Sequence, residues 1–262
     1  MSIMVEGRPA SPFGARLRQW RTHRGISQLA LAAKVGSTAR HLSFLETGRS
    51  RPSRQMVLRL GEALGLPLRE RNQLLQAAGL AAAYPEAELS GPDLAPHRAA
   101  LHTLLRAHEP YPALVVDRHW TVLLANPAAQ RLYGQDLVGV NIIRRFVADP
   151  TARHVIVNWP QIAWAGQRRL RHQSGQAPFD QTLADLVRLV EAALHDVPRP
   201  DEPNEQPVLC PWYRIDGQII KTIGIAARFD PTTDITLDEL RIELTYPLDA
   251  VADAFFRHTT TT

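Results

Sequence analysis

Residues 27–53 read SQLALAAKVGSTARHLSFLETGRSRPS, a pattern that indicates two short helices joined by a tight turn. The turn contains Gly36, and glycine adopts a positive φ at little conformational cost. Ala32 is small enough for two helix backbones to approach closely, and Leu42 and Leu45 can fill the wedge beneath the second helix. The pattern predicts a helix-turn-helix, in which the second helix enters the major groove of DNA.

Helical signals continue on both sides of this motif. Apolar residues recur at intervals of three and four, and Gly65 and Gly79 supply helix stops. We therefore expect further helices at residues 13–23, 53–64 and 67–78. Together with the two central helices, they predict an all-α bundle of five helices.

Basic residues are concentrated at the start of the chain. Residues 1–80 hold 13 Lys and Arg against 4 Asp and Glu, whereas residues 81–262 hold 17 against 22. A local positive excess favours a polyanionic partner such as double-stranded DNA. An ordinary solvated basic face, or a five-helix bundle used for protein contact, remains an alternative.

The outward face of the second helix carries the candidate base-reading residues. Arg40 can donate two hydrogen bonds to guanine, and Ala39 and Phe44 suit contacts with thymine methyl groups. Residues at helix starts, and the arginines that follow the helix, suit phosphate contacts. The predicted DNA-contacting residues are Ser27, Gln28, Ser37, Thr38, Ala39, Arg40, His41, Ser43, Phe44, Arg49, Arg51 and Arg54.

This register resembles that of the xenobiotic-response-element family, the phage-repressor-like helix-turn-helix proteins. The positions of the family motif are occupied by Gln28, Ala32, Gly36, Leu42, Leu45, Glu46, Gly48 and Arg51-Pro52. The resemblance covers residues 13–80 and implies a sequence-specific DNA-binding domain. It also implies that Glu46 supports the fold rather than contacting bases.

Residues 81–96 (AAAYPEAELSGPDLAP) hold three prolines, a glycine and three acidic residues. This composition predicts a linker or a loosely packed crossing segment. We therefore expect a DNA-binding domain at residues 1–80, the linker at residues 81–96 and a second domain at residues 97–262.

The second domain mixes helical segments with β-prone runs. Residues 113–125 predict a hairpin with its turn at residues 117–119, and Asn126-Pro127 predicts the start of a helix. Asp216-Gly217 predicts a second hairpin turn. Further helices are expected at residues 98–107, 141–147, 153–171 with an interruption at Pro160, and 182–195, and strands at 208–215, 219–228 and 242–244. The domain is therefore predicted to be α+β.

Residues 108–132, HEPYPALVVDRHWTVLLANPAAQRL, are similar to the start of a PAS-type domain. They are also similar to the MmyB-like ligand-binding domain of bacterial regulators, as are Asn158-Trp159 and the RLRH of residues 169–172. The resemblance spans about residues 98–257. It implies a PAS-like antiparallel sheet enclosing a small-molecule pocket, with a fatty acid or similar lipid as ligand.

A carboxylate-headed lipid needs hydrogen-bond donors at one end and apolar walls elsewhere. Tryptophans beside prolines suit such walls, although filling the core is the commoner fate of an aromatic residue. The alternation over residues 219–225 fits a strand with one buried face. The predicted ligand-binding residues are Arg144, Arg145, His154, Ile156, Asn158, Trp159, Trp164, Trp212, Tyr213, Ile223 and Ile225. Each polar one has the alternative of a surface or helix-capping group.

The sequence carries no glycine-rich phosphate loop, no G-x-S-x-G and no H-E-x-x-H, and its ten histidines lack metal-ligand spacing. We therefore expect no enzymatic activity, no metal and no resident cofactor. Cys210 is the single cysteine. We expect it to be a small buried hydrophobe rather than a nucleophile or redox sensor.

No run of 18 apolar residues and no signal-peptide core are present, which predicts a cytoplasmic protein without membrane contact. Two hypotheses follow: a transcription regulator whose DNA binding responds to a small apolar ligand, or a DNA-binding protein whose second domain serves only dimerisation or partner recruitment. A homodimer is expected because one helix-turn-helix reads few base pairs. Candidate dimer contacts are the helices at residues 69–78 and 248–256.

Overall fold

The computed structural model describes residues 11–200, 210–230 and 232–258. The chain divides into two compact units. The first contains the described residues up to Glu86 together with Thr233–Ile235, and the second contains the rest. Each unit has a hydrophobic core of its own.

The first unit is a bundle of five helices, as the sequence predicts. Its elements are α1 (Pro12–His23), α2 (Gln28–Lys34), α3 (Ala39–Glu46), α4 (Arg54–Ala63) and α5 (Leu68–Ala77). The first four helices begin at a serine or threonine whose hydroxyl accepts a hydrogen bond from the N–H three residues later. These caps satisfy backbone donors that the helix itself leaves without partners.

Helix α1 packs closely against the end of α3. Trp20 and Leu17 of α1 and Leu45 of α3 are fully buried in one core. A Cβ atom at Gly14 would lie 2.4 Å from the carbonyl oxygen of Glu46, so only glycine fits there. The turn between α2 and α3 has Gly36 at φ +65°, which confirms the predicted helix-turn-helix geometry.

The segment at residues 81–96 makes more contacts than its composition suggests. Asn72, which is buried on α5, and Arg54 together bond the main chain of residues 81–84. At the far end of the segment, Arg98 donates hydrogen bonds to two carbonyl oxygens. The composition signals turns, but these bonds come from side chains on the flanking helices.

The second unit contains a four-stranded antiparallel sheet in the order β2-β1-β6-β5. Its strands are β1 (Ala113–Val116), β2 (Val122–Ala125), β5 (Thr222–Ala227) and β6 (Arg241–Pro247), and a separate hairpin contains β3 (Tyr213–Ile215) and β4 (Gln218–Ile220). Both predicted hairpins are confirmed. Asp216 and Gly217 have φ values of 48° and 78°, as a tight turn with two left-handed residues requires.

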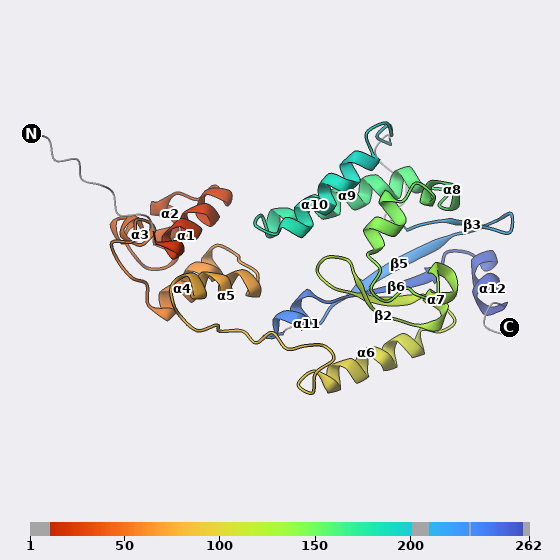
Figure 1. Ribbon diagram of the computed structural model, residues 1–262, viewed down its shortest axis with the longest axis horizontal. Helices are drawn as coiled ribbons and strands as arrows, with labels where there is room; N and C mark the ends of the chain where they lie inside the picture. The colour runs from red at the N-terminus through yellow and green to blue at the C-terminus, as the bar shows by residue number, and fades with distance from the viewer. Residues whose placement is uncertain (1–10, 201–209, 231, 259–262) are drawn as a thin grey trace, which may run out of the picture. The chain divides into compact units, whose positions relative to one another are not determined.

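Helices cover both faces of the four-stranded sheet. They are α6 (Ala95–Ala107), α7 (Pro127–Tyr133), the π-helical turn η1 (Arg144–Ala148), α8 (Ala152–Val155), α9 (Trp159–Gln176), α10 (Gln181–Ala193), α11 (Ile235–Glu239) and α12 (Ala250–His258). Helices α6 and α11 share a core with one face, and α7, α9 and α10 share a core with the other (Figure 1).

Two predicted boundaries in this unit are wrong. The break in the segment at residues 153–171 falls at residues 156–158, where Ile156 forms a β-bridge with Tyr213, and not at Pro160. Pro160 lies in the first turn of α9, where its missing N–H costs no hydrogen bond. The strand predicted at residues 219–228 is two strands, β4 and β5, which belong to different sheets.

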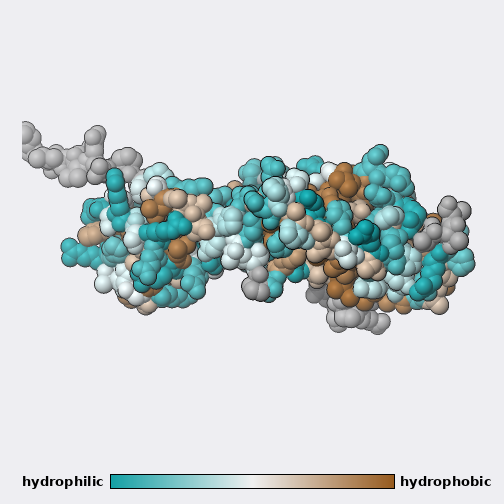
Figure 2. Space-filling view, turned by 90° about the horizontal axis from the view of Figure 1, so that it is seen from below, coloured by the Kyte–Doolittle hydropathy of each residue, from teal (hydrophilic) through white to brown (hydrophobic). Residues whose placement is uncertain are grey.

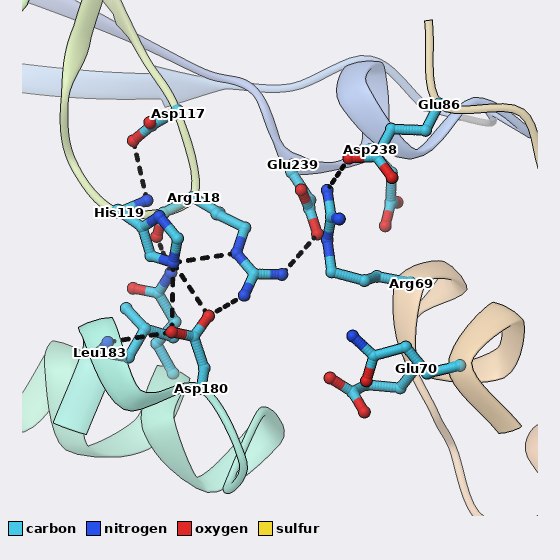
Figure 3. A network of polar contacts seen from close by, with 12 residues as sticks. Arg69, Glu70, Glu86, Asp117, Arg118, His119, Asp180, Leu183, Asp238 and Glu239 are labelled. Carbon is cyan, nitrogen blue, oxygen red and sulfur yellow. Dashed lines mark hydrogen bonds and ion pairs between the residues drawn. The ribbon is translucent and has the colours of Figure 1, made fainter. Parts of the chain in front are cut away.

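A polar network fixes the β1–β2 turn against the helices. Arg118 donates hydrogen bonds to Asp180 and Glu239, and His119 lies 2.9 Å from the Asp180 carboxylate (Figure 3). Asp180 is also the N-cap of α10, accepting the N–H of Leu183. One buried carboxylate therefore sets both the turn and the start of α10 within the second unit.

Candidate DNA-binding surface and ligand site

Helix α3 has one face in the core and the other in solvent. Leu42 and Leu45 are fully buried, as predicted, whereas Arg40 is exposed and Ser43 is half-buried. The predicted contacts Ser37, Thr38, Ala39, His41 and Phe44 lie on or immediately before this same helix. The structure thus groups them on one element, while their contact with DNA stays a prediction.

Phe44 is the centre of a small cationic stack. The guanidinium carbon of Arg40 lies 5.3 Å from the centroid of the Phe44 ring, and that of Arg49 lies 5.9 Å from it. The main-chain carbonyl of Phe44 also accepts a hydrogen bond from the N–H of Arg49, at 2.8 Å. The ring therefore holds two predicted DNA-contacting arginines next to each other.

Glu46 ties α3 to α1 and α2. Its carboxylate accepts hydrogen bonds from Arg21 at 2.6 Å and from Gln28 at 2.7 Å, and it is 5% exposed. The bond to Glu46 raises the pKa of Arg21 above its ordinary value. The structure gives Glu46 the fold-supporting contacts that the family resemblance implies. Gln28, predicted as a phosphate contact, has one amide N–H committed to this network.

The arginines of the DNA-binding unit differ in whether their side chains form hydrogen bonds or ion pairs within the protein. Among the described residues, none accepts a hydrogen bond or forms an ion pair with the exposed side chains of Arg40, Arg49 or Arg51. Arg54, predicted with them as a phosphate contact, instead donates to the carbonyl oxygens of residues 81–82. Its guanidinium therefore has a structural role that the sequence pattern does not reveal.

The remaining predicted contacts are helix caps. The hydroxyl of Ser27 accepts the N–H of Ala30, and the hydroxyl of Thr38 accepts the N–H of His41. Each hydroxyl keeps its own hydrogen as a donor. Both caps lie at helix N-termini, where backbone N–H groups and the helix dipole favour a negatively charged phosphate.

The sheet of the second unit has two faces of different chemistry. Side chains alternate along β6, so Ile242 and Leu244 lie on one face and Arg241, Glu243 and Thr245 lie on the other. The first face packs against α6 and α11 in a shared hydrophobic core. The second carries three polar residues although helices also cover it.

These three residues, Arg241, Glu243 and Thr245, form what we call the polar strip. Arg169 of α9 donates a hydrogen bond to Glu243 at 3.0 Å, so the strip lies beneath that helix. All three residues are only half-buried. Gly224 lies opposite Thr245 in the sheet. Polar groups that stay partly accessible between two layers are typical of the lining of a ligand site.

The Thr245 end of the polar strip is lined by two tyrosines and the cysteine. The hydroxyl of Tyr213 lies 3.4 Å from that of Tyr133, and Tyr133 also bonds Thr245. The Cys210 thiol occupies the space beside Gly224, 2.9 Å from where a Cβ would stand. Burial raises the pKa of both tyrosines and of the thiol. The two hydroxyls therefore stay protonated at neutral pH, and the thiol is buried as predicted.

The predicted ligand-binding residues do not all meet. Ile223 and Ile225 pair with Tyr246 and Leu244, which places them on the α6 face of the sheet, opposite the polar strip. They cannot share a wall with Tyr213, which is buried on the strip's side. The structure does not bring these two isoleucines together with Tyr213, because the break at residue 221 separates β5 from the alternation of β4, and their contact with a ligand stays a prediction.

Other predicted ligand-binding residues form hydrogen bonds within the protein or are buried in its core. The amide of Asn158 donates to the carbonyl of Cys210 and accepts the N–H of Trp212, so it holds the chain leading into β3. Ile156 and Trp159 are buried in the core, and Trp159 donates to the carbonyl of Phe146.

The last members of the set lie at the surface. Arg144, Arg145 and His154 are exposed, and Trp164 and Trp212 are half-buried. Ile225 is 53% exposed. Patches of apolar side chains reach the surface among polar ones in the space-filling view (Figure 2). Exposure leaves these residues available for contacts but does not assemble them around one ligand.

The three residues of the polar strip, Arg241, Glu243 and Thr245, were missed in the sequence analysis. The signal was present as the alternation of polar and apolar residues at 241–246. Such alternation normally indicates a sheet with one face in water. Only the placement of α9 over that face shows that the polar side chains lie between two layers.

Metal and membrane features are also absent from the described part of the chain. No three His, Cys, Asp or Glu residues within it are grouped to hold a metal ion. None of its helices is long and apolar enough to cross a membrane.

Comparison with known families identifies both units. A family model described as the MmyB-like transcription regulator ligand binding domain matches residues 97–258, well over half of the chain. A second model, described as a helix-turn-helix domain, matches residues 12–74. A comparison with curated proteins gives no match.

Proposed function

The chain belongs to the MmyB-like transcription regulators, and from this premise we propose that an apolar ligand in its second unit controls how tightly its first unit binds DNA. The family establishes a DNA-binding transcription regulator with a ligand-binding domain. The class of ligand, the contacting residues and the homodimer are our own inference.

The observation that carries the DNA-binding role is the state of the arginines around α3. Arg40, Arg49 and Arg51 are exposed, and no described carboxylate pairs with them. The two buried carboxylates of the five-helix bundle, Glu46 and Glu70, are neutralised by other arginines of the bundle. The positive charge at α3 is therefore available to phosphates and to guanine edges.

We propose a fatty acid or similar lipid as the ligand, bound in a PAS-like manner between the sheet and the helical layer of α7 and α9. The polar strip supports this placement because an apolar site usually carries a few polar groups that orient the ligand. The tyrosine hydroxyls beside Thr245 supply donors within an otherwise apolar core. Ile223 and Ile225, on the other face of the sheet, are not part of this proposal.

Regulation requires that the ligand bind one conformation of the protein more tightly than another. The protein would act as a homodimer, because two helix-turn-helix units reading half-sites about one helical turn apart give the usual specificity. The sign of the regulation follows from which conformation the ligand prefers.

The test begins with native mass spectrometry of the freshly purified full-length protein. A co-purified mass matching a lipid supports the sensor. A tightly dimeric protein that carries no ligand and binds no added fatty acid supports the other function, in which the second unit only dimerises or recruits a partner.

DNA binding is then measured by fluorescence anisotropy on duplexes selected from a random library by the full-length protein. A change in affinity on adding decanoate supports the proposal. An unchanged affinity with decanoate demonstrably bound would contradict the control of DNA binding by this ligand.

A further inference from the structure

Two arginines lie close to the ring of one tryptophan beside the polar strip. The guanidinium carbons of Arg169 and Arg241 lie 4.3 Å and 5.2 Å from the centroid of the Trp120 ring. Arg169 comes from α9 and Arg241 from the first residue of β6. Two distant segments therefore bring two cations to one indole, whose own N–H is held by Gln173 at 2.9 Å.

The charges of this cluster do not balance. Glu243 is the one carboxylate that pairs with the two arginines among the described residues, and it uses a single oxygen, Oε1, for both. That oxygen lies 3.0 Å from Arg169 and 2.8 Å from Arg241 Nε. Two positive groups thus share one negative group, which leaves a net positive charge.

The arginines also have hydrogen-bond donors to spare. The contact of Arg241 Nε with Glu243 is an ion pair without hydrogen-bond alignment. Glu243 is the one described residue that accepts from the Arg241 guanidinium, so most of its N–H donors have no partner among the described residues. A guanidinium presents five N–H donors in a planar fork that matches a carboxylate.

The cluster is partly withdrawn from water. The side chains of Arg241 and Glu243 are 31% and 23% exposed, under α9, whereas that of Arg169 is 40% exposed and reaches solvent. Burial and the neighbouring charge of Arg169 lower the pKa of Arg241. An added anion would offset both effects, because it supplies the missing negative charge and accepts the free donors.

We propose that Arg169 and Arg241, supported by Trp120, form the anion-binding end of the ligand site and take the carboxylate of an apolar acid. The alkyl chain would run along the polar strip toward Thr245 and the tyrosines. This inference rests on the proposed function, because it names the headgroup chemistry of that same site. In this inference Arg169 and Arg241 take the place of Arg144 and Arg145 as the headgroup donors.

The experiment compares two matched ligands on the full-length, delipidated protein by isothermal titration calorimetry. Decanoate and decan-1-ol share an alkyl chain, and only decanoate carries a charge. We expect the wild-type protein to bind decanoate about tenfold or more tightly than decanol, as charge-assisted hydrogen bonds to a carboxylate require.

The variant Arg169→Gln/Arg241→Gln should lose this preference while it keeps its affinity for decanol. Arg241→Lys should restore the preference only in part, because a lysine has charge without the planar fork. Arg106→Gln, an exposed arginine on α6, is the control and should leave the preference unchanged. Thermal unfolding of each variant confirms that it is folded.

The outcomes separate the two levels of the proposal. A double variant that is folded and still prefers decanoate overturns the arginine anchor. Equal binding of the two ligands by the wild-type protein also overturns the anchor but leaves an apolar ligand in place. Binding of neither ligand overturns both the anchor and the proposed ligand class.

Discussion

The arginines of the first unit fall into two groups. In one group the guanidinium N–H groups donate hydrogen bonds within the protein, and in the other they do not. Arg16 and Arg21 bond the buried carboxylates Glu70 and Glu46, and Arg24 and Arg71 bond main-chain carbonyls. Such residues stabilise the bundle, and substituting them would damage the fold together with any binding. The arginines around α3 have no such bonds, so substituting them should change DNA binding alone.

Arg40→Ala should weaken binding to the selected duplex by about 1–3 kcal/mol and relax the preference at one base position, as loss of a bidentate guanine contact does. Fluorescence anisotropy on the selected duplex and on random duplex measures both effects. An equal loss on the two duplexes would show that Arg40 contacts phosphate.

Arg49→Ala should weaken binding to specific and random DNA alike and reduce the salt dependence by about one released counterion. Arg54→Ala is the matched control, because the guanidinium of Arg54 is engaged with residues 81–82. A salt slope that is unchanged in Arg49→Ala but reduced in Arg54→Ala would reverse the two assignments.

Phe44→Leu should weaken DNA binding less in the Arg40→Ala background than in the wild-type protein, because the ring acts by holding Arg40. Phe44→Tyr keeps the ring and should keep the affinity. An equal loss in both backgrounds would show that Phe44 contributes through contacts of its own, such as the thymine methyl contact predicted from the sequence.

At the scale of elements, one buried amide joins the first hairpin of the second unit to its helices. Asn126 Oδ1 caps α7 and also accepts the N–H of Ala113, which begins β1. Its Nδ2 donates to the carbonyls of Leu105 and Tyr111, at the end of α6 and just beyond it. A residue that is predicted as a simple helix cap therefore positions three elements.

Asn126→Ala should destabilise the second unit by about 2–4 kcal/mol, more than an ordinary cap, because several buried groups lose their partner at once. Urea denaturation followed by tryptophan fluorescence measures the change. Asn126→Asp keeps the cap but loses the two donated bonds, so an intermediate loss is expected. If Asn126→Ala reduced the free energy of unfolding by no more than the loss of an exposed N-cap does, Asn126 would not position three elements.

The last helix, α12, is joined to the chain before β1 by an exposed charge cluster. Hydrogen bonds from Arg257 and Tyr111 lower the pKa of the Asp253 carboxyl. A lowered folded-state pKa means that the contribution to stability is present above the unfolded pKa of Asp and is lost as the pH falls through the folded pKa. NMR titration of the Asp253 carboxyl should show this lowered value, and Tyr111→Phe should raise it. A titration midpoint of the Asp253 carboxyl at the ordinary pKa of aspartate would contradict the hydrogen bonds from Arg257 and Tyr111.

At the scale of the whole molecule, the proposed regulation is a coupling between two binding events. If decanoate changes the affinity for DNA by some factor, DNA must change the affinity for decanoate by the same factor. Calorimetric titration of decanoate with and without the selected duplex measures this reciprocity. If the DNA affinity responds to decanoate but the measured decanoate affinity does not respond to DNA, the decanoate binding seen by calorimetry is not the event that controls DNA binding.

The five-helix bundle, both hairpins and the two family resemblances follow from the sequence alone. Those features rest on local signals: glycines at positive φ, capping hydroxyls and side-chain periodicity, all of which act within a few residues. For the same reason, the inward leucines of α3 were predictable.

The tertiary structure is needed to show which side chains form bonds within the fold. It is also needed to show which face of the sheet carries polar groups beneath a helix. Arg54 and Asn158 look available in the sequence but bond main chain that is distant along the chain. Arg169 and Arg241 meet at Trp120 only because α9 crosses the sheet. Contacts between residues that are distant in the sequence produce no local sequence pattern, so the candidate ligand site can be seen only in the folded structure. The DNA-binding helix is formed by one continuous stretch of sequence, and its local pattern is therefore sufficient to predict it.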